Sequence, residues 1–445
     1  MEEVDVVLLY EKALRELDVA CIVKALAQRL HGLRVEIVQQ NYGYPYALKN
    51  FRPRVVALPF CYQNRSNNIL LTTWRKSIFF NLTWEQLLYP GNKTAKTPRG
   101  DFAVNRVIHH SWSSFYSGYL RQQGVPADHI FTNGNPAYAL YREPYRHYFK
   151  QRDVLASQYE LNPKRKWVFF PENYNWAFYD QAMLNQMIHD GQKPDEVYEM
   201  KAFSSRSFET VIRWCKMLAD RGDVELIIRP RPSTLLDDFA AKIKEILHLI
   251  PDCMNINQQE TVREWILASD VVISSYSTSL IEAAVAGKTA FMLEPYPLPI
   301  SLQQDWHELL PHLTNEREFI DVLLVDSADV ASKPLGEWAR SAMLSQGDPI
   351  LNLVDYLARL CQGKIQRPPI PSKNSVSLPG RFPLPPWLLF EYRKLRLRLQ
   401  PPEHIPFDQV EPDRKHDVIS ASDINERVNK WDTFMSNSVV SGKNY

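Results

Sequence analysis

The sequence predicts an α/β protein made of two parallel-sheet domains. Strand-like Val4–Leu9 and Val35–Val38 flank Leu14–Leu30, whose apolar residues recur at helical spacing. A strand, a helix and a second strand at this spacing form a right-handed parallel unit. The same alternation starts again at the strand-like Trp167–Phe170 and continues for more than a hundred residues. Two such halves indicate two Rossmann-like domains.

The remaining elements follow from the same patterns. In the first half we expect strands at Val55–Pro59, Val107–His109 and Ile130–Thr132 and a helix at Ser113–Gln123. In the second half we expect strands at Val224–Ile228, Val271–Ile273 and Ala290–Leu293, with helices at Ser207–Arg221, Asp237–Leu249 and Thr261–Ser269. We place the domain boundary near residue 150, which gives domains over residues 1–150 and 151–362. The helix Ile350–Cys361 closes the second domain.

Composition excludes several classes of protein. The 445 residues are 45% hydrophobic, enough for two cores, and 52 Lys and Arg balance 51 Asp and Glu, which argues against a general nucleic-acid binder. The five cysteines are scattered and never form CxxC, so we expect no metal, no disulfide framework and a reducing compartment. No apolar run reaches 18 residues and the acidic start MEEVDVV lacks a signal-peptide pattern, which favours the cytoplasm.

The segment Asp270–Pro295 has the pattern of an anion site. A buried strand leads into five hydroxyl side chains and then a short helix that carries Glu282 in its first turn. The free N–H groups and positive dipole at a helix start attract anions. The alternative is an ordinary serine-rich helix cap. The hydroxyl residues are Ser274, Ser275, Ser277, Thr278 and Ser279.

Two further segments follow predicted strands of the second half. Arg229 and Arg231 alternate with prolines at the end of one strand and form a candidate fork for phosphate. Glu172 and Asn173 follow the first strand of this half, where polar groups beside aromatic rings suit a sugar or base. Ligands of open α/β sheets bind beyond the carboxyl ends of the strands, so we expect these residues at one donor site. The alternative for each is a solvated turn.

Candidate catalytic residues lie in the first half. Glu85 and Asp101 occupy a long segment of little periodicity and are candidates for a general base or nucleophile, and His110 ends a predicted strand. Each could instead be structural, as a cap, an ion pair or a buried histidine. The candidates for the acceptor side are Glu11, Arg15 and Trp84. The first strand-to-helix loop contains no glycine, which excludes a conventional dinucleotide site there.

The chain changes character after Gly363. Residues 363–445 are rich in proline and basic residues, and we expect this extension to be partly disordered, with a mobile end at Ser420–Tyr445. Within it, Trp387–Leu399 mixes aromatic, leucine and basic residues, a pattern typical of peripheral contact with an anionic membrane. The alternative is a basic helix packed on the protein body.

The second half resembles the nucleotide-binding domain of GT-B glycosyltransferases. The residues that carry this resemblance are Ala268–Ile273, Ser274–Ser279, Glu282–Ala284 and Gly287–Lys288. The density of hydroxyl groups and the Arg-Pro element are similar to Kdo and sialic acid transferases and to CDP-glycerol transferases. Sialyltransferases have His-Pro where this chain has Arg229-Pro230 and Arg231-Pro232.

The first half resembles the surface carbohydrate biosynthesis proteins, and the similarity spans residues 4–310. It rests on Arg15–Asp18, Asn81–Gln86, Pro98–Phe102 and Gly134–Pro136. The resemblance implies a GT-B fold of two Rossmann-like domains facing a central cleft, with no metal or cofactor. The first domain would bind a glycan or lipid-linked glycan acceptor, and the second would bind a nucleotide-sugar donor.

The expected function is therefore a cytoplasmic glycosyltransferase, placed at the inner face of the membrane if the tail binds there. It would move a sugar from a nucleotide donor, with a CMP-linked donor favoured, onto a bacterial surface polysaccharide such as capsule or lipopolysaccharide. Three alternatives remain open at this point. They are a CDP-polyol phosphotransferase of the teichoic-acid type, a non-hydrolysing nucleotide-sugar epimerase, and a non-catalytic glycan assembly protein.

Overall fold

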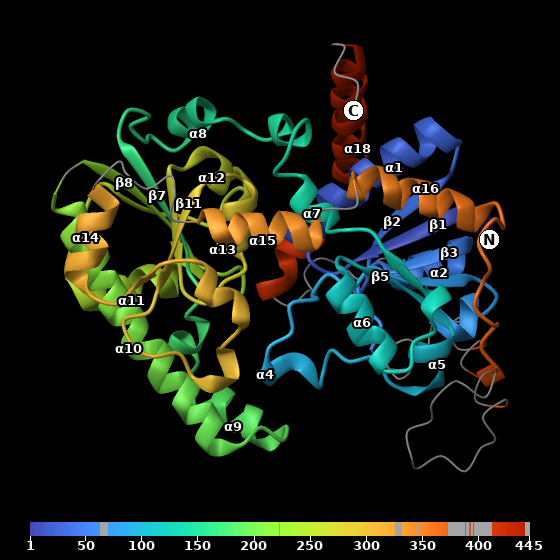
Figure 1. The fold of residues 1–445 in the computed structure, drawn as a ribbon, viewed down its shortest axis with the longest axis horizontal. Coiled ribbons are helices and arrows are strands. Elements are labelled where there is room, and N and C mark those ends of the chain that lie inside the picture. Colours follow the sequence, from blue (N-terminus) through green and yellow to red (C-terminus); the bar gives the residue numbers. More distant parts are fainter. Residues whose placement is uncertain are drawn as a thin grey trace. The chain divides into compact units, whose positions relative to one another are not determined.

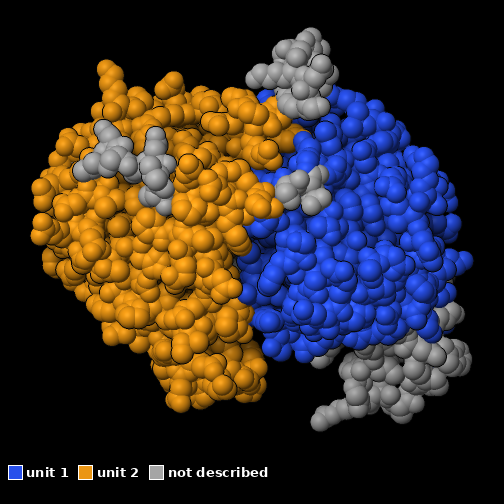
Figure 2. Space-filling model, in the orientation of Figure 1, with its two compact units in different colours: residues 1–88, 92–140, 342–445 blue, residues 89–91, 141–341 orange. Residues whose placement is uncertain are grey.

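The computed structural model describes residues 1–62, 70–221, 223–324, 332–344, 347–372, 388, 391–392, 395 and 412–440. The chain divides into two compact units, coloured separately in Figure 2. Unit 1 contains Met1–Leu88, Asn92–Leu140 and Ala342–Tyr445, and unit 2 contains Tyr89–Gly91 and Tyr141–Ser341. The prediction of α/β architecture is confirmed. The division differs from the expected one, because the chain enters unit 2 at residue 141 and returns to unit 1 at residue 342.

Unit 1 contains a six-stranded parallel sheet in the order β2-β1-β3-β4-β5-β6 (Figure 1). The strands are β1 (Glu2–Tyr10), β2 (Val35–Gln39), β3 (Phe51–Leu58), β4 (Ile78–Asn81), β5 (Val107–Ser111) and β6 (Ile130–Thr132). Apolar residues of β1, β3 and β4 are buried in one core with Phe102 and Trp74. Strand β4 was missing from the prediction, because its four residues are too few to show a period.

The helices of unit 1 follow its strands. The first, α1 (Ala13–His31), ends where Gly32 takes a left-handed conformation at φ 65°, the conformation that glycine adopts without a steric cost. The other helices of unit 1 are α2 (Tyr44–Asn50), α5 (Gly100–Asn105), α6 (Ser114–Gln122), η1 (Ala127–His129), α7 (Pro136–Ala139), α16 (Pro349–Cys361), η9 (Pro412–Asp417) and α18 (Ala421–Val440). The short helix α4 (Pro90–Lys93) belongs partly to each unit.

Unit 2 contains a second six-stranded parallel sheet, in the order β12-β11-β10-β7-β8-β9. Its strands are β7 (Lys166–Pro171), β8 (Val224–Arg229), β9 (Met254–Ile256), β10 (Val271–Ser274), β11 (Thr289–Leu293) and β12 (His312–Leu313). Strands β8, β10 and β11 are buried along their whole length, as expected for parallel strands with helices on both faces.

The helices of unit 2 alternate with these strands. The principal ones are α8 (Arg152–Gln158), α9 (Gln181–His189), α10 (Pro194–Ala219), α11 (Leu236–Leu247), α12 (Val262–Ala268), α13 (Ser279–Val285) and α14 (Glu316–Leu324). Helix α15 (Lys333–Met343) spans the return of the chain to unit 1, and short 3-10 turns are η2 (Tyr145–Tyr148), η3 (Asn175–Phe178), η4 (Ile300–Leu302) and η5 (Asp305–Leu309).

Two elements after residue 341 correct the predicted organisation. Helix α16 packs against α1, β1 and β3 and therefore completes unit 1 rather than the second domain. Helix α18 (Figure 1) packs against α1. Its Trp431 is fully buried, so most of the segment expected to be mobile is an ordered helix. Most of Trp387–Leu399 lies outside the described residues. Within the part of the chain that the structure describes, no helix is long and apolar enough to span a bilayer.

Candidate functional site

Three strands of unit 2 end side by side and deliver the predicted donor residues to one edge. Pro171 at the end of β7 lies opposite Arg229 at the end of β8. The hydroxyl of Ser274, at the end of β10, donates to the Pro171 carbonyl at 2.6 Å, and the N–H of Glu172 donates to the Arg229 carbonyl at 3.0 Å. The segments after these strands therefore start from one point on the sheet edge.

Arg231 is an exposed cation at this edge with a fixed position. Its Nη1 donates to the side-chain oxygens of Asn173 and Asn175, both at 3.2 Å. The Tyr276 hydroxyl donates to the Asn173 carbonyl at 3.2 Å, which links the turn after β7 to the loop after β10. These two partners are neutral amides, so they fix the position of the guanidinium without neutralising its charge. A bound anion could pair with that charge.

Arg229 differs from the predicted phosphate fork. It is buried, and its Nη2 donates to the carbonyls of Gln258 and Glu260 at 3.2 and 3.1 Å. Burial lowers the pKa of its guanidinium to about 10. Arg229 therefore supports the loop before α12, and Arg231 alone presents its charge at the surface.

Glu172 is a buried carboxyl group beside Arg231. Its side chain is only 3% exposed, and one oxygen accepts from the N–H of Tyr174. Burial raises the pKa of Glu172 to about 7, although the N–H of Tyr174 and the charge of Arg231 oppose this shift. Glu172 thus changes its charge near neutral pH, next to the proposed anion site.

The hydroxyl-rich loop contributes fewer groups than the sequence suggests. Ser274 and Ser275 are fully buried, and Ser277 Oγ bonds to Ser279 Oγ at 3.1 Å. Ser277 is partly exposed and Thr278 is exposed. Glu282 lies one turn into α13, and its Oε2 accepts a hydrogen bond from the Tyr141 hydroxyl, which reduces its capacity to bind a ribose.

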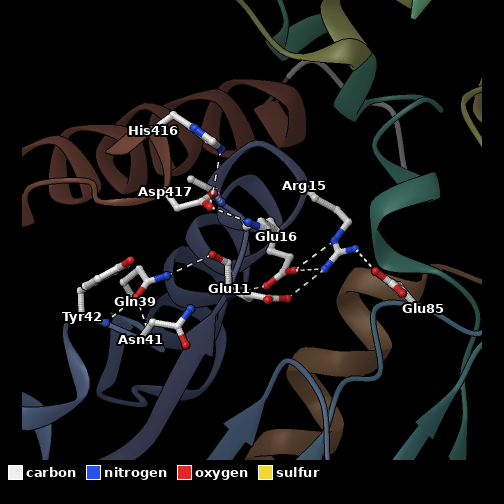
Figure 3. A network of polar contacts seen from close by, with 11 residues as sticks. Glu11, Arg15, Glu16, Gln39, Asn41, Tyr42, Glu85, His416 and Asp417 are labelled. Atoms are coloured by element: carbon white, nitrogen blue, oxygen red, sulfur yellow. Dashed lines mark hydrogen bonds and ion pairs between the residues drawn. The ribbon is translucent and has the colours of Figure 1, made fainter. Parts of the chain in front are cut away.

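Unit 1 contains a compact cluster of charges where β1 and β4 end, shown in Figure 3. Arg15 on α1 donates from Nη1 to Glu85 at 2.8 Å and from Nη2 to Glu16 at 2.6 Å, while Glu11 lies 3.7 Å from Nη2. Glu16 is fully buried, and its other oxygen accepts from the Glu11 N–H at 2.7 Å. Burial raises the pKa of Glu16, and the charge of Arg15 opposes this shift. Arg15 is therefore fixed by Glu16 and presented to Glu85.

Glu85 is the exposed member of this cluster. Its side chain is 40% exposed and pairs with Arg15 through one oxygen and with Lys96 through the other. The turn before it is strained, because Thr83 is β-branched and has φ 49°. Both oxygens of Glu85 are thus paired with cations, and a carboxylate is the form that a base or nucleophile requires.

The other predicted residues of the first half are buried or lie at the other edge of the sheet. His110 is fully buried, with Nδ1 3.1 Å from the Leu82 carbonyl, and burial lowers its pKa to about 4. Asp101 accepts from Arg106 at 3.0 Å, just before the amino end of β5, whereas Glu85 follows the carboxyl end of β4. Trp84 is 5% exposed and cannot stack on an acceptor without movement. The His110 carbonyl also accepts from Gln86 Nε2 at 3.0 Å, so this buried histidine lies next to the turn that carries Glu85, whereas Asp101 lies at the opposite end of the strands.

Comparison with solved structures shows the fold. A structure described as the wall teichoic acid polymerase TagF is 12% identical, with 81% of this chain and 90% of that chain covered at a TM-score of 0.54. A variant of TagF soaked with CDPG is 13% identical over 81% and 88%, at a TM-score of 0.52. A UDP-N-acetylglucosamine 2-epimerase is 14% identical over 84% and 100%, at a TM-score of 0.50.

The fold is GT-B-like. Its two α/β units, each with a parallel six-stranded sheet, are shared with these structures. No family model and no curated protein sequence matches the chain. At this level of identity the likeness concerns the fold, and the chemistry must be argued from the residues.

Sequence reasoning missed two members of the clusters. Lys96 lies in an unpatterned loop, and nothing in its neighbourhood predicts its pairing with Glu85. Asn175 is one of the two amides that hold Arg231. A usable signal for Asn175 was present, since it belongs to the polar and aromatic run Glu172–Trp176 after β7.

Proposed function

We propose that the protein is a GT-B transferase in which unit 2 binds a nucleotide-activated donor and unit 1 activates the acceptor. The observation that carries the proposal is Arg231, an exposed guanidinium fixed by Asn173 and Asn175 where three strands end. A diphosphate or phosphate of the donor would pair with this guanidinium. The exposed hydroxyl of Thr278 and the partly exposed Ser277 would add hydrogen bonds.

Glu85 would act on the acceptor. In the proposed step its carboxylate takes the proton of an acceptor hydroxyl, and the hydroxyl oxygen forms a bond to the anomeric carbon of the donor sugar. The bond from that carbon to the phosphate oxygen breaks, and the nucleotide leaves with the electron pair. Arg231 would stabilise the negative charge that develops on the leaving phosphate.

The donor preference of the proposal is a cytidine nucleotide linked to a sugar, and the acceptor is a bacterial surface glycan. The fold-level likeness to a TagF variant soaked with CDPG keeps a CDP-polyol phosphotransferase as a second candidate. It would form a phosphodiester, whereas a glycosyltransferase forms a glycosidic bond. Product analysis by mass spectrometry distinguishes the two. Turnover of donor in the absence of any acceptor would instead indicate an epimerase.

A thermal-shift panel of CMP, CDP, UDP, GDP and ADP tests the donor site. We expect a cytidine nucleotide to raise the melting temperature of the wild-type protein and to have no effect on R231A. The matched control is R213A, which removes another exposed arginine of unit 2, paired with Glu209 on α10. Stabilisation by UDP or GDP alone would contradict the cytidine preference, and no stabilisation by any nucleotide would contradict the donor site.

A further inference from the structure

The start of helix α1 lacks a cap from its own sequence. Lys12 occupies the N-cap position in an extended conformation and makes no side-chain cap bond. Helices usually begin at Ser, Thr, Asp or Asn, whose oxygen accepts from a free N–H of the first turn. Here the N–H of Ala13 donates to Oδ1 of Asp417 at 2.9 Å, across 404 positions of the chain. The last residue of η9 therefore caps the first helix.

Asp417 also forms an ion pair with Lys12, the residue at the N-cap position. Its Oδ2 lies 3.0 Å from Nζ of Lys12 and 3.5 Å from Nε2 of His416. The Asp417 side chain is almost completely buried. Figure 3 shows it in contact with His416. A buried carboxylate with hydrogen-bonding partners on both oxygens has a well-defined position, because any displacement would leave a charge unpaired out of water.

The capped turn is the turn that holds the charge cluster of unit 1. Glu11 lies directly before Lys12, and its N–H donates to the buried carboxylate of Glu16. Arg15 lies in the same first turn of α1 and donates hydrogen bonds to both Glu16 and Glu85. Residues 11–16 are thus fixed by Asp417 at one end and hold Glu85 at the other.

The segment that supplies Asp417 is anchored along the length of α1. Arg427 on α18 pairs with Asp18 at 3.2 Å, and the Cys21 thiol lies 4.0 Å from the Ile424 carbonyl. Trp431 and the other buried residues of α18 pack on the same helix. These contacts hold η9 and α18 on unit 1 independently of the Asp417 carboxylate, so Asp417 can be altered while the segment stays in place.

We infer that Asp417 is a positioning residue for Glu85. It fixes the first turn of α1, the turn fixes Arg15, and Arg15 orients the Glu85 carboxylate. This inference rests on the proposed catalytic role of Glu85. Asp417 itself contacts neither donor nor acceptor, and its effect is on the geometry of the cluster. Well-oriented catalytic groups depend on such supporting contacts, and a small misplacement costs a large part of the rate.

The test compares D417A, D417N and R427A in the full-length protein. In D417N the side-chain oxygen can still accept from Ala13, although the charge opposite Lys12 is lost. R427A is the matched control, because it removes an ion pair between α18 and α1 away from the capped turn. Hydrogen exchange of the amides at residues 10–17 and 82–87 is measured by mass spectrometry. It is combined with kcat and KM for release of nucleotide from a CMP-linked sugar.

We expect D417A to speed exchange at least tenfold in both segments and to lower kcat at least tenfold, with the donor KM unchanged within twofold. D417N should have an intermediate effect, and R427A should leave exchange of residues 10–17 and kcat unchanged. Unchanged exchange in D417A, or equal effects of D417A and R427A, would overturn the inference. If the wild-type protein releases no nucleotide while exchange responds as expected, the proposed reaction fails and the positioning of the cluster by Asp417 stands.

Discussion

Arg15 and Glu85 form an ion pair with 2.8 Å between Nη1 and Oε1, although 70 positions separate them in the chain. The pair joins the start of α1 to the turn after β4, two places where parallel strands of unit 1 end. Arg15 binds the buried Glu16 as well as Glu85. Its Nε and Nη2 both donate to the Glu16 carboxylate, which fixes the guanidinium in place. The two ion-pair partners therefore orient Glu85, the most exposed residue of a turn whose neighbours Trp84 and Gln86 are buried.

Replacement of Glu85 should show whether Glu85 or Asp101 is the catalytic carboxylate of the first half. We expect E85Q to lower the transfer rate by about 100-fold or more, the usual contribution of a general base, with little change in melting temperature. D101N is the matched control, because Asp101 is exposed and pairs with Arg106 near the amino end of β5. A rate assay with both variants checks this, and loss of activity in D101N but not in E85Q would reverse the assignment.

The two arginines of the Arg-Pro element should respond differently to alanine. R229A leaves the carbonyls of Gln258 and Glu260 without a buried donor, and we expect it to lower the free energy of unfolding by about 3 kcal/mol. R231A removes an exposed side chain and should cost less than about 1 kcal/mol while abolishing nucleotide binding. Urea unfolding and calorimetric titration of CDP measure the two effects. A stable R229A that no longer binds CDP would show that Arg229 contacts the ligand.

Glu172 should make stability depend on pH. Burial raises its folded-state pKa from 4.5 to about 7, so the unfolded chain loses the proton first as pH rises. The contribution of this group to stability is therefore highest below pH 4.5, falls between pH 4.5 and 7, and is constant above. The whole change is about 3 kcal/mol.

The E172Q variant removes this titration. Urea unfolding of wild-type and E172Q at pH 4.5 and pH 8 should show that E172Q gains about 3 kcal/mol relative to wild-type at the higher pH. E209Q serves as the control, because Glu209 lies exposed on α10 beside Arg213. Equal pH dependence of E172Q and wild-type would mean that folding does not shift the pKa of Glu172.

Gly134 should be irreplaceable for steric reasons. It has φ 108°, and a Cβ at this position would lie 2.8 Å from the Met343 carbonyl oxygen and 3.0 Å from Pro349 Cγ. We expect G134A to lower the free energy of unfolding by at least about 3 kcal/mol through strain and overpacking. G118A on α6 is the contrast, because open space surrounds that position. It should gain about 1 kcal/mol from better helix propensity. Thermal melts of both variants test the pair.

The sequence pattern predicts most of the fold because strands and helices have local periods. The β1–α1–β2 unit and the strands β7, β8, β10 and β11 follow from apolar runs and spacing alone. The prediction of a helix at Ile350–Cys361 is confirmed by α16, but no local pattern states that α16 packs in unit 1. The same holds for α18, which is ordered mainly through its contacts with α1.

The candidate site was less predictable, because its polar contacts join residues that are distant in the chain. Residue types indicated Glu85, Arg15 and Arg231, yet the inward turn of Arg229 and the burial of His110 depend on tertiary packing. One local feature of the sequence does indicate a distant contact. A lysine at the N-cap of α1 violates the usual preference, and such a violation indicates that a distant residue supplies the cap.

The order of the chain has a consequence for synthesis. Residues 141–341 of unit 2 form one uninterrupted stretch, whereas the parts of unit 1 lie on both sides of it. On the ribosome, unit 2 can therefore fold to completion while the first sheet still lacks α16 and α18. We expect a nascent chain, stalled once residue 341 has left the ribosomal exit tunnel, to resist protease across residues 141–341 and to be cleaved in residues 1–140.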